Sequence, residues 1–226
     1  LTSRDAMGFR HLATRGTEIL LNGEPIFLRG ISIHEEAPGG GRVTGRDQAR
    51  TLLRWAKELG CNFVRLAHYP HNEPMIREAE RMGLMVWAEI PVYWTILWRN
   101  QETYALAEQQ LREMIERDKN RASVVIWSVA NETPRGEPRL AFLKGLIDEA
   151  RRLDPTRLIS AATEPTWKDG HVYLDDPLGA HLDVLGVNEY VGWYGGAPED
   201  APGIRWHTSY EKPLIVSELG AGALAG

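Results

Sequence analysis

The alternation of short apolar runs with longer amphipathic segments constrains the fold of this chain more than any other feature. Seven apolar runs have the length of buried β-strands. They cover residues 25–33, 62–67, 84–90, 123–130, 158–162, 183–187 and 213–217. Strands that are apolar on both faces are typical of a parallel sheet covered by helices.

The segments between the first five runs show the spacing of amphipathic helices. Residues 46–59, 72–83, 103–120 and 139–153 repeat apolar side chains every three or four positions. Asn72 is a plausible N-cap, and Gly60 and Gly83 are stop signals. A strand–helix–strand order predicts parallel pairing through right-handed crossovers. Seven strands favour an α/β fold of the (β/α)8 TIM-barrel type over a doubly wound sheet, and no glycine-rich phosphate loop follows the first strand.

The two ends of the chain predict its domain organisation. Residues 9–21 resemble a hairpin, so residues 1–21 are interpreted as the remnant of a preceding β-sandwich or a linker hairpin. Residues 22–226 are assigned to the barrel. No eighth strand follows residue 217, so the predicted barrel is truncated after strand seven, which leaves two sheet edges unpaired.

Charge and composition exclude several classes of function. The 226 residues carry a formal net charge of -5, so no basic surface indicates a nucleic-acid partner. No apolar run approaches the ~18 residues that cross a bilayer, so no membrane partner is expected. Cys61 is the only cysteine, which excludes an intrachain disulfide and favours a structural thiol. A cytoplasmic and a periplasmic or secreted location both remain open.

Polar side chains gather where the predicted strands end. In a barrel, these carboxyl ends form the active-site rim. The residues in question are His34, Glu35, Glu36, Arg65, His68, Tyr69, Glu89, Asn131, Glu132, Asn188, Glu189, Tyr190 and Glu218.

Two of these carboxylates suggest a reaction. Glycoside hydrolysis needs one carboxyl group that protonates the leaving oxygen and a second that attacks the sugar or activates water. Glu132 and Glu218 follow strands four and seven, which lie across a barrel from each other. A single glutamate at a strand end is most often a solvated or salt-bridged side chain. The pair, each after an apolar strand, favours catalysis.

Several motifs together resemble glycoside hydrolase family 2. WSVANE (127–132) resembles the acid/base motif of that family, and IVSELG (215–220) resembles its nucleophile motif. FVRLAHYP (63–70), GISIHEE (30–36), RDKNRASVVIW (117–127), LDPTR (153–157) and NEYVGWY (188–194) also match in order. NEYVGWY and LGAGALAG (219–226) are most similar to the β-glucuronidase branch. Glu189 departs from that branch, which has an arginine at this position.

The resemblance implies a role for each matched residue. Glu132 would be the acid/base and Glu218 the nucleophile, with Arg65 and Tyr190 holding Glu218 ionised. The remaining residues would bind substrate: His34, Glu36, His68, Asn131, Asn188, Trp193 and Tyr194. Asn131 would bond the sugar 2-hydroxyl, while Trp193 and Tyr194 would form an aromatic wall. No cofactor is implied.

Each of these interpretations has a plainer alternative. Arg65 could form a core salt bridge, and His34 and His68 could be satisfied core histidines. A metal site of His34, Glu36 and His68 is disfavoured because they lie on different loops without a recognised ligand spacing. Glu89 is a rival carboxylate that lies deeper in its strand and more plausibly supports other residues. Trp94 and Trp98 follow strand three and could extend a sugar platform or only pack a loop.

The sequence therefore predicts a retaining exo-β-glycosidase of β-galactosidase or β-glucuronidase type, with a carbohydrate as substrate. The alternative is a non-catalytic sugar-binding or scaffolding fragment of such an enzyme, because an unclosed barrel loses preorganisation. An aldolase is disfavoured because no lysine stands at a strand end, and a metallohydrolase because His-x-His is absent after strand one. The sugar, homo-oligomer formation and additional β-sandwich domains are left open.

Overall fold

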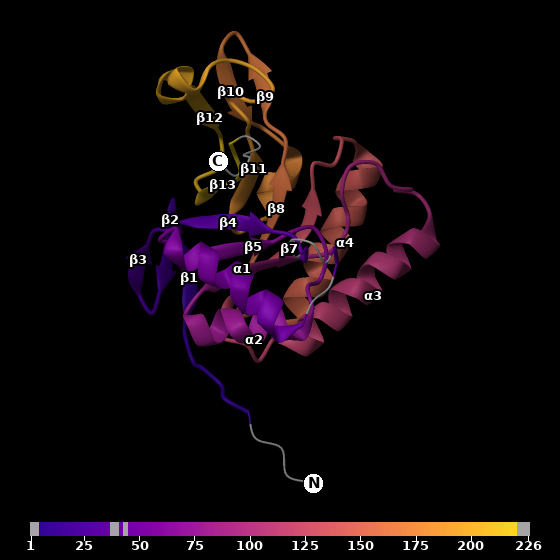
Figure 1. Ribbon diagram of the computed structural model, residues 1–226. Helices are drawn as coiled ribbons and strands as arrows, with labels where there is room; N and C mark the ends of the chain where they lie inside the picture. The colour runs from indigo at the N-terminus through magenta and orange to yellow at the C-terminus, as the bar shows by residue number, and fades with distance from the viewer. Residues whose placement is uncertain (1–4, 37–40, 43–44, 221–226) are drawn as a thin grey trace.

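A curved parallel sheet forms the centre of the molecule (Figure 1). The computed structural model describes residues 5–36, 41–42 and 45–220. The sheet runs β4 (Gly30–Ile33), β5 (Phe63–Leu66), β6 (Met85–Glu89), β7 (Val124–Asn131), β8 (Leu158–Thr163), β11 (Leu185–Asn188) and β13 (Leu214–Glu218). Adjacent strands of the sheet follow the order of the chain and pair in parallel. The two edge strands, β4 and β13, approach each other, since Ser32 Oγ of β4 donates to Ser217 O of β13 at 3.3 Å. The sheet is thus a nearly closed seven-stranded barrel, which confirms the predicted TIM-barrel class.

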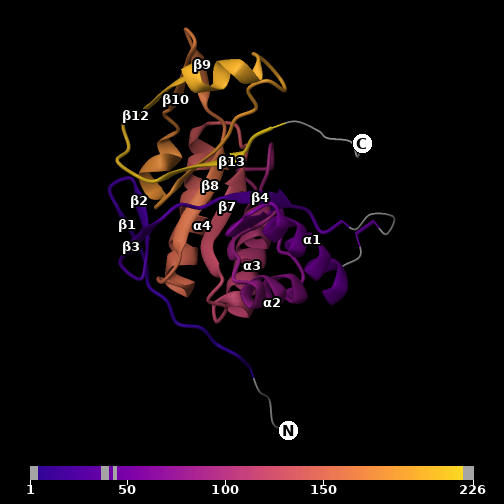
Figure 2. The same ribbon diagram turned by 60° about the vertical axis from the view of Figure 1, so that its left-hand side comes forward.

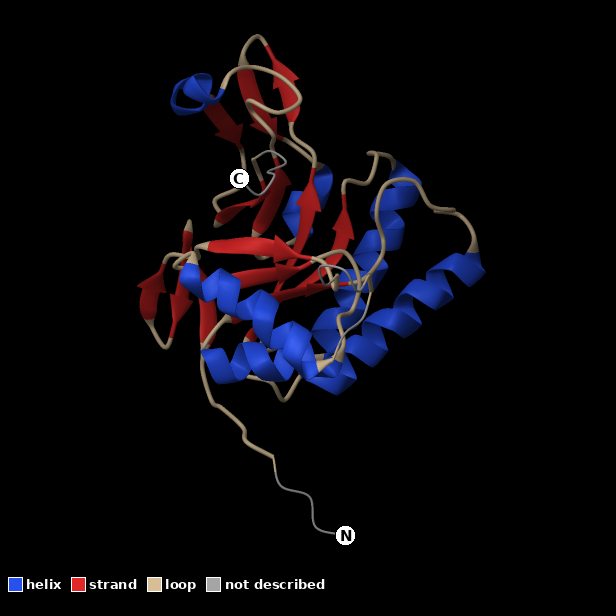
Figure 3. Cartoon of the chain, in the orientation of Figure 1, coloured by secondary structure: helices blue, strands red, loops and turns tan. Residues whose placement is uncertain are grey.

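Four helices cover the outer face of this sheet (Figure 3). They are α1 (Arg46–Glu58), α2 (Glu73–Met82), α3 (Gln101–Asp118) and α4 (Glu137–Leu153), all close to the predicted bounds. Gly83 ends α2 at φ +67°, a left-handed conformation that favours glycine. The side chain of Asn100 caps α3 by accepting from Thr103 N at 2.8 Å.

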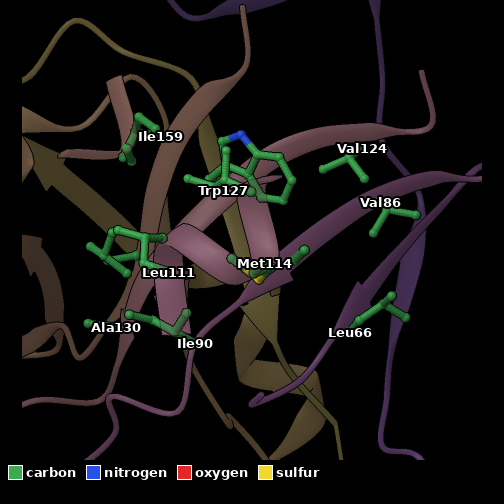
Figure 4. Packing of buried hydrophobic residues seen from close by; sticks show 14 of the residues in the cluster. Leu66, Val86, Ile90, Leu111, Met114, Val124, Trp127, Ala130 and Ile159 are labelled. Carbon is green, nitrogen blue, oxygen red and sulfur yellow. The ribbon is translucent and has the colours of Figure 1, made fainter. Parts of the chain in front are cut away.

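The apolar core lies between the sheet and these helices (Figure 4). Leu111 and Met114 of α3 are fully or nearly fully buried near Trp127 of β7, and Ile159 of β8 belongs to the same cluster. This close packing fixes the strand positions and so the positions of the side chains at the strand ends.

An antiparallel meander precedes the barrel: β1 (Leu12–Arg15), β2 (Glu18–Leu21) and β3 (Glu24–Ile26). The predicted single strand over residues 25–33 is therefore wrong, because it spans β3 and β4. The Asn62 side chain explains the break, since its Nδ2 donates to Phe27 O and its Oδ1 accepts from Arg29 N. Ile19 of β2 packs against the barrel residues Phe63 and Trp87. The assignment of residues 1–21 to a separate unit stays a prediction.

A small sheet was not predicted. It consists of β9 (Thr166–Lys168), β10 (His171–Leu174) and β12 (Arg205–Thr208), and it lies at the top of Figures 1 and 2. The short 3-10 helices η1 (Pro177–His181) and η2 (Pro198–Gly203) occupy the connections where the earlier units have α-helices. Val172 and Leu174 of β10 cluster with Val187 of β11. The small sheet therefore packs beside the carboxyl end of β11.

Candidate active site

Arg65 on β5 is the centre of a hydrogen-bond network at the carboxyl ends of the strands. Its guanidinium is 2% exposed. Nε and Nη2 donate to the two oxygens of Glu89 at 3.2 and 2.9 Å, and Nη2 also donates to Asn131 Oδ1 at 2.7 Å. Nη1 donates to Glu218 Oε1 at 2.5 Å. One cation thus holds residues of β6, β7 and β13 together.

Glu89 is the buried counter-ion of this cation. Trp87 Nε1 donates to its Oε2 at 2.9 Å, and His68 Nδ1 lies 2.8 Å from its Oε1. Burial opposes ionisation of Glu89, but the Arg65 charge and the His68 hydrogen bond outweigh it and bring its pKa below the usual value. Burial likewise lowers the pKa of Arg65, but its two carboxylate neighbours raise it more. Glu89 is therefore a buried carboxylate that holds Arg65 and His68 in place.

Glu218, at the end of β13, receives donors on both oxygens. Arg65 binds Oε1, and the Tyr190 hydroxyl donates to Oε2. Burial and the acceptance by Glu218 raise the pKa of the Tyr190 phenol, so its hydroxyl stays protonated and donates. His68 Nε2 lies 3.6 Å from Glu218 Oε1. The Glu218 side chain remains 17% exposed, so the anchored carboxylate still meets solvent.

Glu132 follows β7 in a left-handed backbone conformation, with φ at +48°. Its N–H donates to Ala162 O of β8 at 2.9 Å, which pins this turn to the neighbouring strand. Asn188 Nδ2 donates to Glu132 Oε1 at 2.8 Å, and Trp94 Nε1 donates to Oε2 at 3.1 Å. Unlike Glu218, Glu132 is held by neutral donors.

The two glutamates belong to one connected network. Asn188 Nδ2, which binds Glu132, also donates to Asn131 Oδ1 at 3.0 Å, and the same oxygen accepts from Arg65. Ser217 Oγ, next to Glu218, donates to Asn188 Oδ1 at 2.8 Å. The barrel therefore brings Glu132 and Glu218 to one site, each with its carboxylate orientation fixed.

The structure places the other expected site residues at varying distances from this network. His34 packs edge-on against His68, with ring centroids 5.2 Å apart, and burial and His68 lower its pKa. Tyr194 packs edge-on against Tyr190, with centroids 5.1 Å apart. Trp193 is 51% exposed and its ring lies beside Tyr194, not beside the network. Glu36 is exposed, and its carboxylate lies 3.8 Å from Arg42. In the described residues, Glu36 makes no contact with the network.

Sequence reasoning missed three contributors. The sequence suggests Trp94 as part of a sugar platform or as loop packing, but the structure shows it donating to Glu132 Oε2 from a residue with φ at +56°. Ser217 was counted only as a strand residue. Trp167 of β9, which donates to Glu189 Oε2 at 2.7 Å, had no strand-like pattern around it. A hydrogen bond from an indole N–H to a carboxylate on another segment of the chain produces no periodic pattern in the sequence.

The described residues contain no group of three or more His, Cys, Asp or Glu side chains arranged to hold a metal ion. No helix within the described ranges has the length and apolarity to span a bilayer.

Comparisons with known proteins identify the family and the fold. Residues 12–226 match the family model described as Glycosyl hydrolases family 2, TIM barrel domain. A β-glucuronidase of Paenibacillus borealis is 34% identical over 97% of this chain and 39% of its own length, and one of Rattus norvegicus is 33% identical over 97% and 35%. A crystal structure of a GH2 β-galacturonidase from Eisenbergiella tayi bound to galacturonate superposes with a TM-score of 0.85 at 28% identity, over 98% of this chain and 41% of that one.

The chain thus spans between a third and two fifths of the length of these relatives. This chain itself contains the barrel, Glu132, Glu218 and the hydrogen-bond network that connects them. On the family match and the shared fold, the chain belongs to glycosyl hydrolases family 2, whose TIM barrel domain it contains.

Proposed function

We propose that this chain carries the catalytic centre of a retaining exo-β-glycosidase that removes terminal β-linked sugars by double displacement. The observation that carries the proposal is the connected network in which Arg65, Asn131 and Asn188 hold Glu218 and Glu132 at one rim of the barrel. Two carboxyl groups that flank the scissile bond are what glycoside hydrolysis requires.

Glu218 is proposed as the nucleophile. Its carboxylate attacks the anomeric carbon while Glu132 donates a proton to the leaving glycosidic oxygen. The covalent glycosyl ester is then hydrolysed by a water molecule that Glu132 deprotonates. Arg65 and Tyr190 orient the Glu218 carboxylate before attack, because each donates a hydrogen bond to one of its oxygens.

The proposed substrate-binding roles follow from where the side chains lie around the hydrogen-bond network of Glu132 and Glu218. Asn131 Oδ1 is saturated by Arg65 and Asn188, so its Nδ2 is the group available to donate to a sugar hydroxyl. His34 and His68 are proposed to contact the terminal sugar from β4 and β5, and Tyr194 to wall the site beside Tyr190. Glu36 and Trp193 are proposed only as outer binding residues. The relatives are named for glucuronides and galacturonides, so uronides come first among the candidate substrates.

The test measures turnover of aryl β-glycosides with several glycones, uronides included, by the wild type and three variants. Glu218→Ala should lower kcat by roughly 10⁴-fold or more, and Glu132→Ala by roughly 10²- to 10⁴-fold. Added azide should restore turnover by both variants, because azide fits into the space that the missing carboxylate leaves. Glu116→Ala, which removes an exposed carboxylate on α3, is the matched control and should behave as the wild type.

The anomer of the glycosyl azide separates the two roles. In Glu218→Ala, azide attacks from the side of the missing nucleophile and gives the α-azide. In Glu132→Ala, azide attacks the glycosyl-enzyme from the opposite side and gives the β-azide. Full activity of Glu218→Ala would refute the assignment. Binding of sugars by the wild type without any turnover would instead support the non-catalytic alternative.

A further inference from the structure

A second pocket adjoins the candidate catalytic centre on the side of the small sheet. It has a volume of about 720 Å³. Its lining includes Trp167, Asn188, Glu189, Tyr190, Tyr194 and Asp200. Asn188 and Tyr190 are also the residues that hold Glu132 and Glu218, so the pocket and the catalytic centre share a wall.

Glu189 faces this pocket and not the catalytic centre. The side chains of Asn188 and Tyr190 reach Glu132 and Glu218, whereas that of Glu189, between them in the chain, reaches Trp167. Its carboxylate is fixed at both oxygens: Trp167 Nε1 donates to Oε2 at 2.7 Å, and Tyr190 N donates to Oε1 at 2.9 Å. The position of this charge is therefore set by the fold.

The lining combines aromatic surface with acidic charge. Trp167 is 47% exposed and Tyr194 79% exposed, so their rings are available to stack on a planar or sugar ring. Glu189 and Asp200 supply two carboxylates, and neither lysine nor arginine is among the described lining residues. A cationic group bound here would be attracted, and an anionic group would be repelled.

The shared wall places this pocket beside both glutamates, since Asn188 binds Glu132 and Tyr190 binds Glu218. Asn188 lines the pocket and binds Glu132, which under the proposed function protonates the leaving oxygen. A group attached to that oxygen therefore begins next to the pocket mouth. We infer that this pocket is the aglycone subsite, that it takes an uncharged or cationic ring-bearing aglycone, and that Glu189 discriminates against anionic ones. This inference rests on the proposed function.

The test compares aryl β-glycosides of one glycone whose phenyl ring carries no charge, a 4-carboxylate or a 4-trimethylammonium group. The measured quantity is the ratio of kcat/KM for the carboxylate substrate to that for the ammonium substrate. Comparing this ratio between enzymes cancels the intrinsic reactivity of each leaving group. In Glu189→Gln the ratio should rise roughly fivefold or more over the wild type at low salt, and the rise should shrink at 1 M salt.

Glu116→Gln removes the same charge from an exposed position on α3 and should leave the ratio unchanged. A ratio that changes less than twofold in Glu189→Gln, or equally in both variants, would overturn the inference. Binding of 4-hydroxybenzoate and of 4-hydroxyphenyltrimethylammonium, followed by tryptophan fluorescence, gives a second readout that needs no turnover. If the wild type hydrolyses none of the glycosides, the proposed function fails. In that case the binding measurements alone test whether the pocket prefers cations. The wild type should bind 4-hydroxyphenyltrimethylammonium more tightly than 4-hydroxybenzoate, and Glu189→Gln should lose this preference.

Discussion

At the scale of single residues, the two candidate catalytic glutamates differ in the charge of their donors. Glu218 is bound by the Arg65 guanidinium, whereas Glu132 is bound by an amide of Asn188 and the indole of Trp94. The Arg65 guanidinium orients the Glu218 carboxylate through a charged hydrogen bond, whereas both hydrogen bonds to Glu132 come from uncharged donors. This asymmetry supports the proposed division of roles independently of the order of the motifs.

His71, which stacks on Tyr69, gives a prediction about the pH dependence of stability. It is 2% exposed, and its Nε2 lies 2.9 Å from Ala67 O, where it donates. Nδ1 has no partner among the described residues. Burial lowers the pKa of His71 to about 4, so the folded protein keeps it neutral. The unfolded chain, with an ordinary histidine pKa, binds a proton at higher pH.

The stabilising contribution is therefore complete above about pH 6.5 and is lost progressively as the pH falls toward 4. His71→Gln keeps a donor at the position of Nε2 but cannot be protonated. The free energy of unfolding of the wild type, relative to this variant, should fall by about 2 kcal/mol between pH 7 and pH 5. Urea denaturation at both pH values measures it, and a difference that does not change with pH would contradict the burial argument.

At the scale of elements, the accuracy of the sequence-based prediction depended on periodicity. α1 to α4 carry clear apolar stripes, and β5 to β8 are apolar at nearly every position, so the alternating units were placed correctly. The small sheet was missed because residues 166–174 and 205–208 mix tryptophan, histidine and charged residues without strand-like alternation. Its strands form where two loops meet, which no local pattern records. The same reason hid the contact between Trp167 and Glu189.

Gly186 shows how closely β11 of the barrel packs against its neighbours. A Cβ on Gly186 would lie 2.6 Å from Ala161 O of β8 and 2.6 Å from the Trp87 ring of β6. Neither atom can retreat, since one is backbone and the other is a fully buried ring. Gly186→Ala should destabilise the protein by about 1–3 kcal/mol through overpacking, seen as a lower urea midpoint at constant slope.

Gly195→Ala is the matched control for this substitution. A Cβ on Gly195 would meet nothing within 4 Å, so its midpoint should stay close to that of the wild type. Equal midpoints for both variants would mean that β11 can shift away from its neighbours, contrary to the packing described here.

At the scale of the whole molecule, the curvature of the sheet brings Arg65 and Glu218, 153 positions apart, into contact. The order of strands predicted that the ends of β7 and β13 face one rim, and this could be deduced from the sequence because topology follows from the alternation of elements. The family resemblance predicted Arg65 and Tyr190 as the partners of Glu218, but the donors to Glu132, Asn188 and Trp94, could not be deduced. That depends on side-chain geometry across four strands, and Glu36, on the loop after β4, contacts Arg42 instead of the network.

The network makes a prediction about how distant strands are coupled. The side chains of Arg65 and Glu89 are both at most 2% exposed. Each therefore neutralises the buried charge of the other. Arg65→Met should destabilise the protein by about 3–5 kcal/mol, because Glu89 then loses the one guanidinium that contacts it among the described residues. In the double variant Arg65→Met/Glu89→Gln the orphaned charge is gone. Its loss of stability should therefore be smaller than the sum of the two single losses by about 2 kcal/mol or more.

Urea denaturation of the four proteins in this double-mutant cycle measures that coupling. Activity should behave differently from stability, because Glu218 lacks its cationic donor in both proteins that carry Arg65→Met. The double variant should therefore regain stability relative to Arg65→Met while remaining as inactive as that single variant. Strictly additive losses of stability would show that the buried pair is not coupled, and the strands would then be held together by apolar packing alone.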